Sequence, residues 1–291
     1  MNVVRGIFSG FFSFILVIAL IALGIAVTIN YTILNPDFII SELDKLDVHS
    51  IIMDQVRSQL PEEEPYMTKM IAEVATDLEP WLKKQTTDVI YAGYAYLKKD
   101  EELNIVISLE QVKTSIKGKL AQAVREFPPP ELEGATQSQI DFFLSQVYGE
   151  IDSQIPEKIE INEALLGPEI VTQLQKAKEI VGYIELGYKV LIGLTALLVL
   201  LIAFIQWWRA KHIARFVGIA FTIAGVISLV GTIVARFIIF RIVPAEIPAQ
   251  IVAMLPHLVG DFTYPWLVYS IGILIAGIGL IILSVKLRSS D

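Results

Sequence analysis

Four stretches of this sequence contain no charged side chain and are long enough to cross the hydrocarbon core of a membrane, which takes about 20 apolar residues. They are residues 6–36, 190–208, 216–235 and 262–285. The polar residues Asn30 and Asn35 shorten the first stretch, which ends near Thr28. A helix in the core of a water-soluble protein is rarely charge-free over such a length. The sequence therefore predicts four transmembrane helices.

The basic residues beside these stretches set the expected orientation, because Lys and Arg accumulate on the cytoplasmic side of a membrane. They precede the first stretch, join the second to the third and follow the fourth: Arg5, Arg209, Lys211, Arg215, Lys286 and Arg288. We therefore expect a multi-pass plasma-membrane protein with both termini in the cytoplasm. Residues 34–185 and the outer loop 236–264 then lie outside.

The first stretch has also to be weighed as a cleavable signal peptide. Its apolar run is far longer than the roughly 7 to 15 residues usual for such a signal. Ala22, Leu23 and Gly24 form a weak small-residue cleavage site. We expect the segment to remain as a membrane anchor, with cleavage as the alternative.

Charge divides the chain into a membrane part and a water-facing part. Residues 31–185 contain 28 Asp and Glu against 14 Lys and Arg, a net charge of −14, whereas the rest carries 3 acidic and 9 basic residues, a net charge of +6. Three regions are expected: a first transmembrane helix (1–33), an acidic extracytoplasmic domain with a helical stalk (34–185), and a three-helix membrane region (186–291). The absence of cysteine excludes disulfides and thiolate metal sites.

The acidic domain is expected to be mostly helical. Asn35 and Pro36 are typical of a helix start, and apolar residues continue at helical spacing as far as Pro61. Two capping-box patterns, Ser108 with Gln111 and Thr136 with Gln139, mark later helix starts. After the first helix we expect three more. They are residues 66–99, with a break near Pro80, residues 108–127, and residues 136–151.

Two short β-branched segments, 103–108 and 158–162, are expected to be strands that pair in a small ribbon. No proline occurs between Pro168 and Pro244, so one helix is expected to run from about residue 168 into the second span and end near Trp208. At 1.5 Å per residue it would measure about 60 Å, roughly twice the hydrocarbon thickness. The fold class is thus a mainly α membrane protein with four transmembrane helices and a small two-stranded β ribbon.

This organisation resembles a set of uncharacterised prokaryotic integral membrane proteins in which one N-terminal span leads to a large helical extracytoplasmic domain. The resemblance rests on the Asn35-Pro36 helix start, on residues 105–109 and 159–162, and on the long run into the second span. It covers about residues 1–208 and implies an architecture. It implies no activity.

No pattern of residues indicates catalysis, a cofactor or a metal site. The chain lacks a phosphate-binding glycine loop, an HExxH helix and a serine elbow. His49 and Asp54 are five residues apart and would point in different directions on a helix. The acidic clusters 62–64 and 100–102 lack the alternation of a calcium loop and are expected to be solvated turns. We therefore expect a protein that is not an enzyme.

Six residues are candidates for an interface or for coupling between the regions: Glu185, Lys189, Arg236, Glu246, His257 and Asp261. Glu185 and Lys189 are one helical turn apart, so a neutralising ion pair is expected there. Arg236 is expected either to pair with Glu246 or to bind a lipid phosphate. On a helix, His257 and Asp261 could offer two metal ligands or a pH-sensitive hydrogen bond, although solvated side chains are the simpler expectation.

Small residues at four-residue spacing within the spans would permit close helix packing, inside one bundle or between subunits. These pairs are Gly6 and Gly10, Ala22 and Ala26, Ala224 and Ser228, and Gly272 and Ala276. Aromatic anchors are expected at the inner membrane interface (Trp207 and Trp208) and at the outer one (Tyr264 and Trp266). The outer loop is unusually apolar, so we expect it to dock onto the acidic domain or, as the alternative, to contact lipid.

These features favour a non-enzymatic integral membrane protein whose extracytoplasmic domain binds a protein partner or assembles with copies of itself. The second-span helix would transmit its position inward. The alternative is an oligomeric pore or carrier for lipid or weakly charged solutes. No charged residue lies near the middle of a span, which disfavours a proton-driven transporter. Membrane lipid is an expected partner, and nucleic acid is not.

Overall fold

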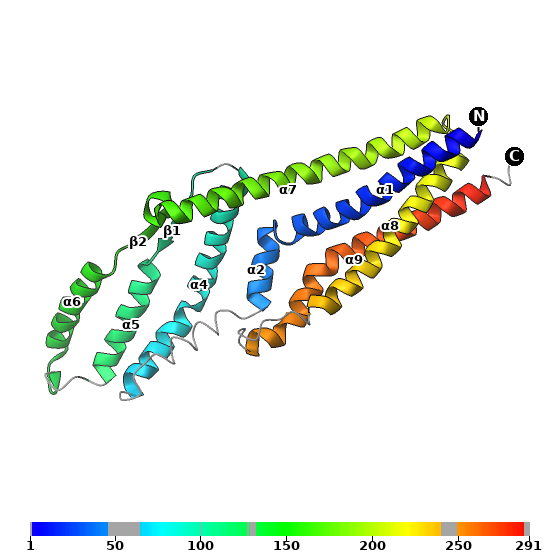
Figure 1. Ribbon diagram of the computed structural model, residues 1–291. Coiled ribbons are helices and arrows are strands. Elements are labelled where there is room, and N and C mark those ends of the chain that lie inside the picture. The colour runs from blue at the N-terminus through cyan, green and yellow to red at the C-terminus, as the bar shows by residue number, and fades with distance from the viewer. Residues whose placement is uncertain are drawn as a thin grey trace. The chain divides into compact units, whose positions relative to one another are not determined.

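The computed structural model describes residues 2–45, 65–99, 101–126, 128, 132–239 and 249–287 (Figure 1). It is mainly helical, with one small sheet, as the sequence predicts. The described elements are α1 (Asn2–Tyr31), α2 (Pro36–Lys45), α4 (Pro65–Lys99), β1 (Asn104–Ser108), α5 (Glu110–Glu126), α6 (Gln137–Gln154), β2 (Lys158–Asn162), α7 (Glu163–Ile205), α8 (Ala210–Ile239) and α9 (Ala249–Lys286).

The chain divides into two compact units, each with its own packing. We call Met1–Glu42 with Glu179–Asp291 the apolar unit, and Leu43–Lys178 the acidic unit. The acidic unit contains 24 Asp and Glu against 14 Lys and Arg, a net charge of −10. Helix α7 begins in the acidic unit and ends in the apolar unit.

Four helices are long and apolar enough to cross a membrane, which confirms the four predicted candidates by length and composition. They are Val4–Tyr31 in α1, Glu163–Ile205 in α7, Ala210–Ile238 in α8 and Leu255–Lys286 in α9. The fourth extends further than expected, because α9 begins at Ala249 and includes residues assigned above to the outer loop. Its helix continues through Pro256 and Pro265.

A core of aliphatic side chains holds the apolar unit together where α1, α7 and α8 meet. Leu16 and Ile202 are completely buried there, and Leu20, Leu198 and Ala220 are nearly so. Beyond this core, Gln206 Nε2 donates a hydrogen bond of 2.7 Å to Ser9 Oγ, so the end of α7 is joined to the start of α1.

Helices α8 and α9 lie side by side in Figure 1 and pack through glycines. A Cβ atom on Gly277 would lie 2.5 Å from the backbone N of Thr222, and one on Gly225 would lie 2.8 Å from the backbone N of Leu274. Close approach of two helices through small residues is the usual way in which membrane helices associate. Of the predicted pairs, Ala224 and Ser228 on α8 are buried, and Ala224 belongs to the core shared with α1 and α7, whereas Cβ atoms on Gly6, Gly10 and Gly272 would have no atom within 4 Å.

The ribbon of the acidic unit confirms the predicted strand pair. β1 and β2 are antiparallel, with Val106 opposite Glu160 at the centre of the register. Alternation places four isoleucines on one face, which are Ile105, Ile107, Ile159 and Ile161. Trp81 Nε1 donates a hydrogen bond of 2.9 Å to the backbone oxygen of Ser108, which joins α4 to β1.

Two of the three predicted helix starts are confirmed. The backbone N–H of Asp37 donates to Asn35 Oδ1 at the start of α2, and Thr136 with Gln139 forms the capping box of α6. The third is shifted by one residue, since Ser108 is the last residue of β1, the backbone oxygen of Leu109 accepts a hydrogen bond from the N–H of Lys113, and α5 begins at Glu110. Ser108 pairs with Lys158 in the sheet, so strand pairing fixes its backbone in an extended conformation.

The long helix into the second span is present, with a break at Gly167. Gly167 has φ 76° and ψ 162°, so residues 163–166 form a separate turn before the continuous part of α7. That part ends at Ile205, where Trp207 and Trp208 adopt left-handed backbone conformations in the turn to α8.

Candidate binding site in the acidic unit

Ion pairs hold α5 and α6 together in antiparallel orientation. Lys113 and Lys117, near the start of α5, both contact Asp152 near the end of α6. Arg125 Nη2, near the end of α5, lies 3.2 Å from Asp141 Oδ1 near the start of α6. Because Lys113 and Lys117 are one turn apart on a helix, they lie on the same face. Helix α5 therefore presents two ammonium groups to the same part of α6.

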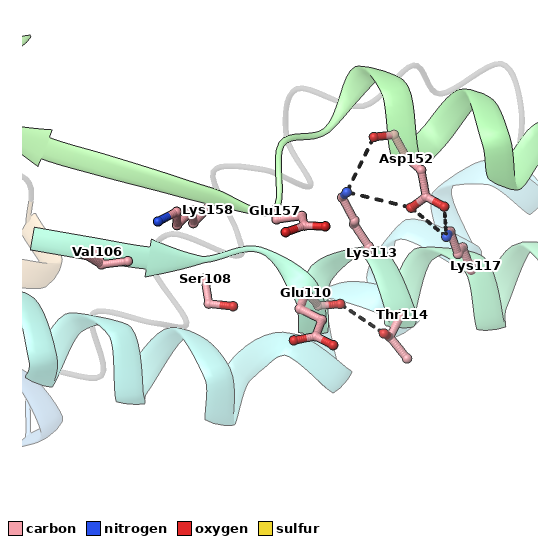
Figure 2. A pocket seen from close by; sticks show the side chains of 9 residues that line it. All are labelled: Val106, Ser108, Glu110, Lys113, Thr114, Lys117, Asp152, Glu157 and Lys158. Atoms are coloured by element: carbon pink, nitrogen blue, oxygen red, sulfur yellow. Dashed lines mark hydrogen bonds and ion pairs between the residues drawn. The ribbon is translucent and has the colours of Figure 1, made fainter.

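The two ammonium groups share a single side-chain carboxylate (Figure 2). Lys117 Nζ lies 2.7 Å from both oxygens of Asp152. Lys113 Nζ lies 3.7 Å from Asp152 Oδ1 and donates a hydrogen bond of 3.5 Å to its backbone oxygen. Only 11% of the Lys113 side chain and 25% of the Lys117 side chain are exposed, against 52% for Asp152. Two lysine side chains that are mostly covered thus face one more exposed aspartate side chain.

Tyr148 on α6 fixes the position of Lys117. Its hydroxyl donates a hydrogen bond of 3.2 Å to the backbone oxygen of Lys117, and its ring centroid lies 5.6 Å from Lys117 Nζ. A cation at this distance from an aromatic ring is attracted to the ring face. Lys117 is therefore held both by charge and by packing.

The charges change the proton affinity of Asp152. The hydrogen bond from Lys117 is the largest influence, and with the charges of Lys117 and Lys113 it holds the pKa of Asp152 below its usual value. Partial burial acts in the opposite direction and is outweighed. Asp152 is therefore ionised at neutral pH, and its contact with the two lysines is an ion pair.

A pocket of about 510 Å³ opens beside Lys113, Lys117 and Asp152, between the ribbon and the facing ends of α5 and α6. We call it the lysine pocket. It is lined by Val106, Ser108, Glu110, Lys113, Thr114, Lys117, Asp152, Glu157 and Lys158. Its volume lies in the range of about 300 to 1,000 Å³ that is usual for ligand sites.

A backbone hydrogen bond joins two segments of the pocket wall. The backbone N–H of Leu109 donates a hydrogen bond of 2.8 Å to the backbone oxygen of Glu157, which ties the start of α5 to the segment before β2. Lys158 forms an ion pair with Glu160 on the same strand, and this contact raises the pKa of Lys158. Of the three lysines in the pocket, Lys113 and Lys117 are therefore the two that converge.

A second hollow of about 390 Å³ adjoins the lysine pocket and shares Ser108, Glu110 and Thr114 with it. Its other lining residues are Trp81, Lys84, Gln85 and Gln111. Gln85 is 9% exposed, and its Oε1 atom has no hydrogen-bond partner among the described residues. The two hollows together form a polar surface around the first turn of α5.

Of the six residues selected from the sequence, the five that the structure describes are not among the residues that line the lysine pocket. Glu185 is half-buried and Lys189 is exposed, one turn apart on α7. His257 is exposed on α9 and Asp261 is half-buried one turn later. Within the described part of the chain, no three His, Asp or Glu side chains are grouped so as to hold a metal ion.

Glu246, the expected partner of Arg236, lies outside the described residues, as do His49 and Asp54. Arg236 instead donates hydrogen bonds to Thr263 Oγ1 at 2.7 Å and to the backbone oxygen of Gly260 at 3.2 Å. The structure therefore joins Arg236 to α9.

Reasoning from the sequence missed the lysine pocket. The signal for the pocket in the sequence was the four-residue spacing of Lys113 and Lys117 on a predicted helix. Such spacing is common on solvated helix faces. Asp152 follows Lys117 by 35 residues, and nothing in the sequence connects them. Comparison of the chain with protein-family models, with curated proteins and with solved structures finds no match.

Proposed function

We propose that this chain is a non-enzymatic, multi-pass protein of the plasma membrane whose acidic unit lies outside the cell and binds another protein chain. Four helices suitable for crossing a membrane support the membrane location. The basic residues at the ends of these helices support cytoplasmic termini. The acidic unit, with its net charge of −10, is then the largest water-facing part of the protein.

The observation that carries the proposal is the convergence of Lys113 and Lys117 on one carboxylate at the wall of an open pocket. The side chains of Lys113 and Lys117 are mostly covered and their ammonium groups share the carboxylate of Asp152, so a second anion would compensate their charge further. A Glu or Asp side chain of a partner would supply the second anion and form charge-assisted hydrogen bonds. The partner is a second copy of this chain or a different acidic protein.

The length of α7 supports a route by which binding could be sensed at the other side of the membrane. Helix α7 is continuous from Pro168 to Ile205 and contributes to both units. Its C-terminal part is fixed to α1 through Ile202 and Gln206. We propose that a displacement of the acidic unit on binding is transmitted along α7.

Site-specific photo-crosslinking of the full-length protein in its native membrane tests the proposal. The crosslinker replaces Val106, which lines the lysine pocket and is 47% exposed. The matched control position is Phe142 on α6, which is 65% exposed and does not line the pocket. We expect one reproducible adduct from position 106 and none of that mass from position 142.

Charge variants decide whether an adduct depends on the lysine pocket. We expect Lys117→Gln to reduce the adduct several-fold, because it removes one of the two converging cations. Lys83→Gln, which removes a 47%-exposed lysine of α4 outside the pocket, should leave it unchanged. An adduct that forms equally in both variants, or no adduct at all, would contradict binding at this site.

A further inference from the structure

Arg236 lies at the end of a span, where a charged side chain needs a partner. It is in the last turn of α8, directly after the charge-free stretch 216–235. The opposite end of α8 carries Lys211 and Arg215. If that end is cytoplasmic, as proposed above, Arg236 lies at the outer interface of the membrane. An arginine near a helix end extends its charged group into the headgroup region, where lipid phosphate groups are available.

The guanidinium of Arg236 is held in a fixed orientation by α9. Its Nε donates to Thr263 Oγ1 and its Nη2 donates to the backbone oxygen of Gly260. Thr263 is only 4% exposed, and its hydroxyl donates to the backbone oxygen of Val259 at 2.7 Å. The backbone oxygen of Gly260 also lies 3.2 Å from Thr263 Oγ1, so the two acceptors of Arg236 are side by side on α9. Arg236 thus satisfies a carbonyl group that α9 presents.

These contacts occupy two of the five N–H groups of the guanidinium. Among the described residues, no protein atom accepts a hydrogen bond from the remaining three. Asp261 follows Gly260 in the chain, is half-buried and takes part in an interaction of its own. Among the described residues, one edge of the planar guanidinium is thus held in place and its other N–H groups meet no acceptor, a geometry that matches a phosphate group.

The surroundings of Arg236 indicate that the phosphate belongs to a lipid. Its neighbour Phe237 is 62% exposed, and Tyr264, which follows Thr263, is 60% exposed. Exposed aromatic side chains at the end of a span are typical of the lipid headgroup region. A free anion would have to approach across this apolar surface, whereas the acyl chains of a phospholipid would cover it.

We propose that Arg236, positioned by Thr263 and Gly260, binds the phosphate group of an outer-leaflet phospholipid. This inference rests on the membrane orientation proposed above and is independent of binding at the lysine pocket. The phosphate would accept hydrogen bonds from the edge of the guanidinium that faces away from Thr263 and Gly260, and the acyl chains would lie along the exposed surfaces of α8 and α9. The lipid would thereby stabilise the α8–α9 contact.

Native mass spectrometry of the full-length protein, released from nanodiscs of phosphatidylglycerol and phosphatidylethanolamine, tests the proposal. We expect a phospholipid to remain bound to the wild type and to be lost about tenfold more readily from Arg236→Gln, as for the loss of a charge-assisted hydrogen-bonded pair. Arg215→Gln removes the same charge from the other end of α8 and should retain the lipid. Equal retention by Arg236→Gln and the wild type would overturn the proposal.

Two further variants separate a positioning effect from loss of the fold. Thr263→Val keeps the arginine but removes the hydroxyl that orients it, so we expect an intermediate loss of lipid. Arg236→Lys keeps the charge without the planar fork and should also bind less lipid than the wild type. Circular dichroism must show native helix content in each variant. Full lipid retention by both folded variants would show that the geometry of Arg236 is not used.

A competition experiment identifies the source of the phosphate. Inorganic phosphate in millimolar excess should not displace the lipid, and diacylglycerol, which has no phosphate, should not be retained. Displacement by inorganic phosphate would show a free-anion site and overturn the lipid assignment. Crosslinking at position 106 in Arg236→Gln should be unchanged, so failure of this proposal can be distinguished from failure of the proposed function.

Discussion

The hydroxyl of Tyr269 on α9 donates a hydrogen bond of 2.7 Å to the backbone oxygen of Leu20 on α1, and the Tyr269 ring lies against Gly24 one turn further along α1. A Cβ atom on Gly24 would lie 2.6 Å from Cε1 of Tyr269 and 3.3 Å from Nε1 of Trp266. The absence of a side chain at Gly24 is therefore what allows the ring to reach the backbone of α1.

We expect Gly24→Ala to destabilise the apolar unit by about 1–3 kcal/mol, the usual cost of forcing an extra methyl group into a packed site. The Tyr269 ring cannot turn away without losing its hydrogen bond to Leu20. Unfolding of the purified protein in mixed micelles, followed by tryptophan fluorescence, measures the effect. Gly10→Ala in the same helix is the control, since its Cβ would have no atom within 4 Å. Equal stability of the two variants would refute the expected close contact.

The contact between α8 and α9 leaves even less room at Gly277. Its Cβ would meet the backbone N of Thr222 at 2.5 Å and the backbone oxygen of Gly218 at 2.9 Å. Backbone atoms cannot move aside as a side chain can, so we expect Gly277→Ala to separate the two helices and to cost about 3 kcal/mol or more. Gly279→Ala, two residues away and with open space around its Cβ, should be nearly neutral.

Crosslinking between paired cysteines on α8 and α9 measures this separation directly. The chain has no cysteine of its own, so each introduced pair reports without interference. We expect the yield between cysteines placed on the faces of α8 and α9 that meet near Thr222 and Gly277 to fall in Gly277→Ala and to stay high in Gly279→Ala. An unchanged yield in Gly277→Ala would mean that the helices do not approach each other as closely as described.

A substitution at Gly167 would strain the backbone without crowding any neighbouring atom. Its φ of 76° and ψ of 162° lie in a region that is essentially restricted to glycine, whereas an added Cβ would have no atom within 4 Å. We expect Gly167→Ala to destabilise the acidic unit by about 1–3 kcal/mol through the backbone alone. Hydrogen–deuterium exchange of peptides covering β2 and the start of α7 should become faster. Gly149→Ala on α6, also without a near neighbour but with a helical backbone, should not weaken that region.

The helices and the ribbon could be predicted because their signals are local. An unbroken apolar run identifies a spanning helix, and β-branched residues such as Ile105 and Val106 identify a strand. The packing could not be predicted in the same way. Spacing selected Gly6 and Gly10 as close contacts, but Gly24 and Gly277 are the crowded ones, since spacing does not show which face meets a neighbour.

Trp266 and the lysine pocket also show that local sequence patterns do not predict packing. Trp266 was expected to anchor the outer membrane interface, yet its Nε1 is buried beside the Cβ position of Gly24. The contact of Lys113 and Lys117 with Asp152 depends on the antiparallel arrangement of α5 and α6, and the chain between them contains no signal for that pairing. Local chemistry therefore predicted the elements, and only their packing brought distant residues together.

Asp152 should make the stability of the α5–α6 contact depend on pH. The hydrogen bond from Lys117 lowers its pKa below the ordinary value of 3.8, and the Lys113 charge adds to this effect. A lowered pKa in the folded state means that the stabilisation is fully present above the pKa of the unfolded chain. It is lost as pH falls below about 4 and through the folded-state pKa.

Hydrogen–deuterium exchange of α5 and α6 peptides, compared between variants at each pH, measures this dependence. At neutral pH we expect faster exchange in Asp152→Asn than in the wild type, and this difference should shrink towards zero as Asp152 becomes protonated in the acid range. Asp141→Asn is the matched control, because its pair with Arg125 is more exposed, at 53% and 55%, and should contribute less. A difference between Asp152→Asn and the wild type that stays constant as pH falls would show that the ion pair with the two lysines does not stabilise the walls of the pocket.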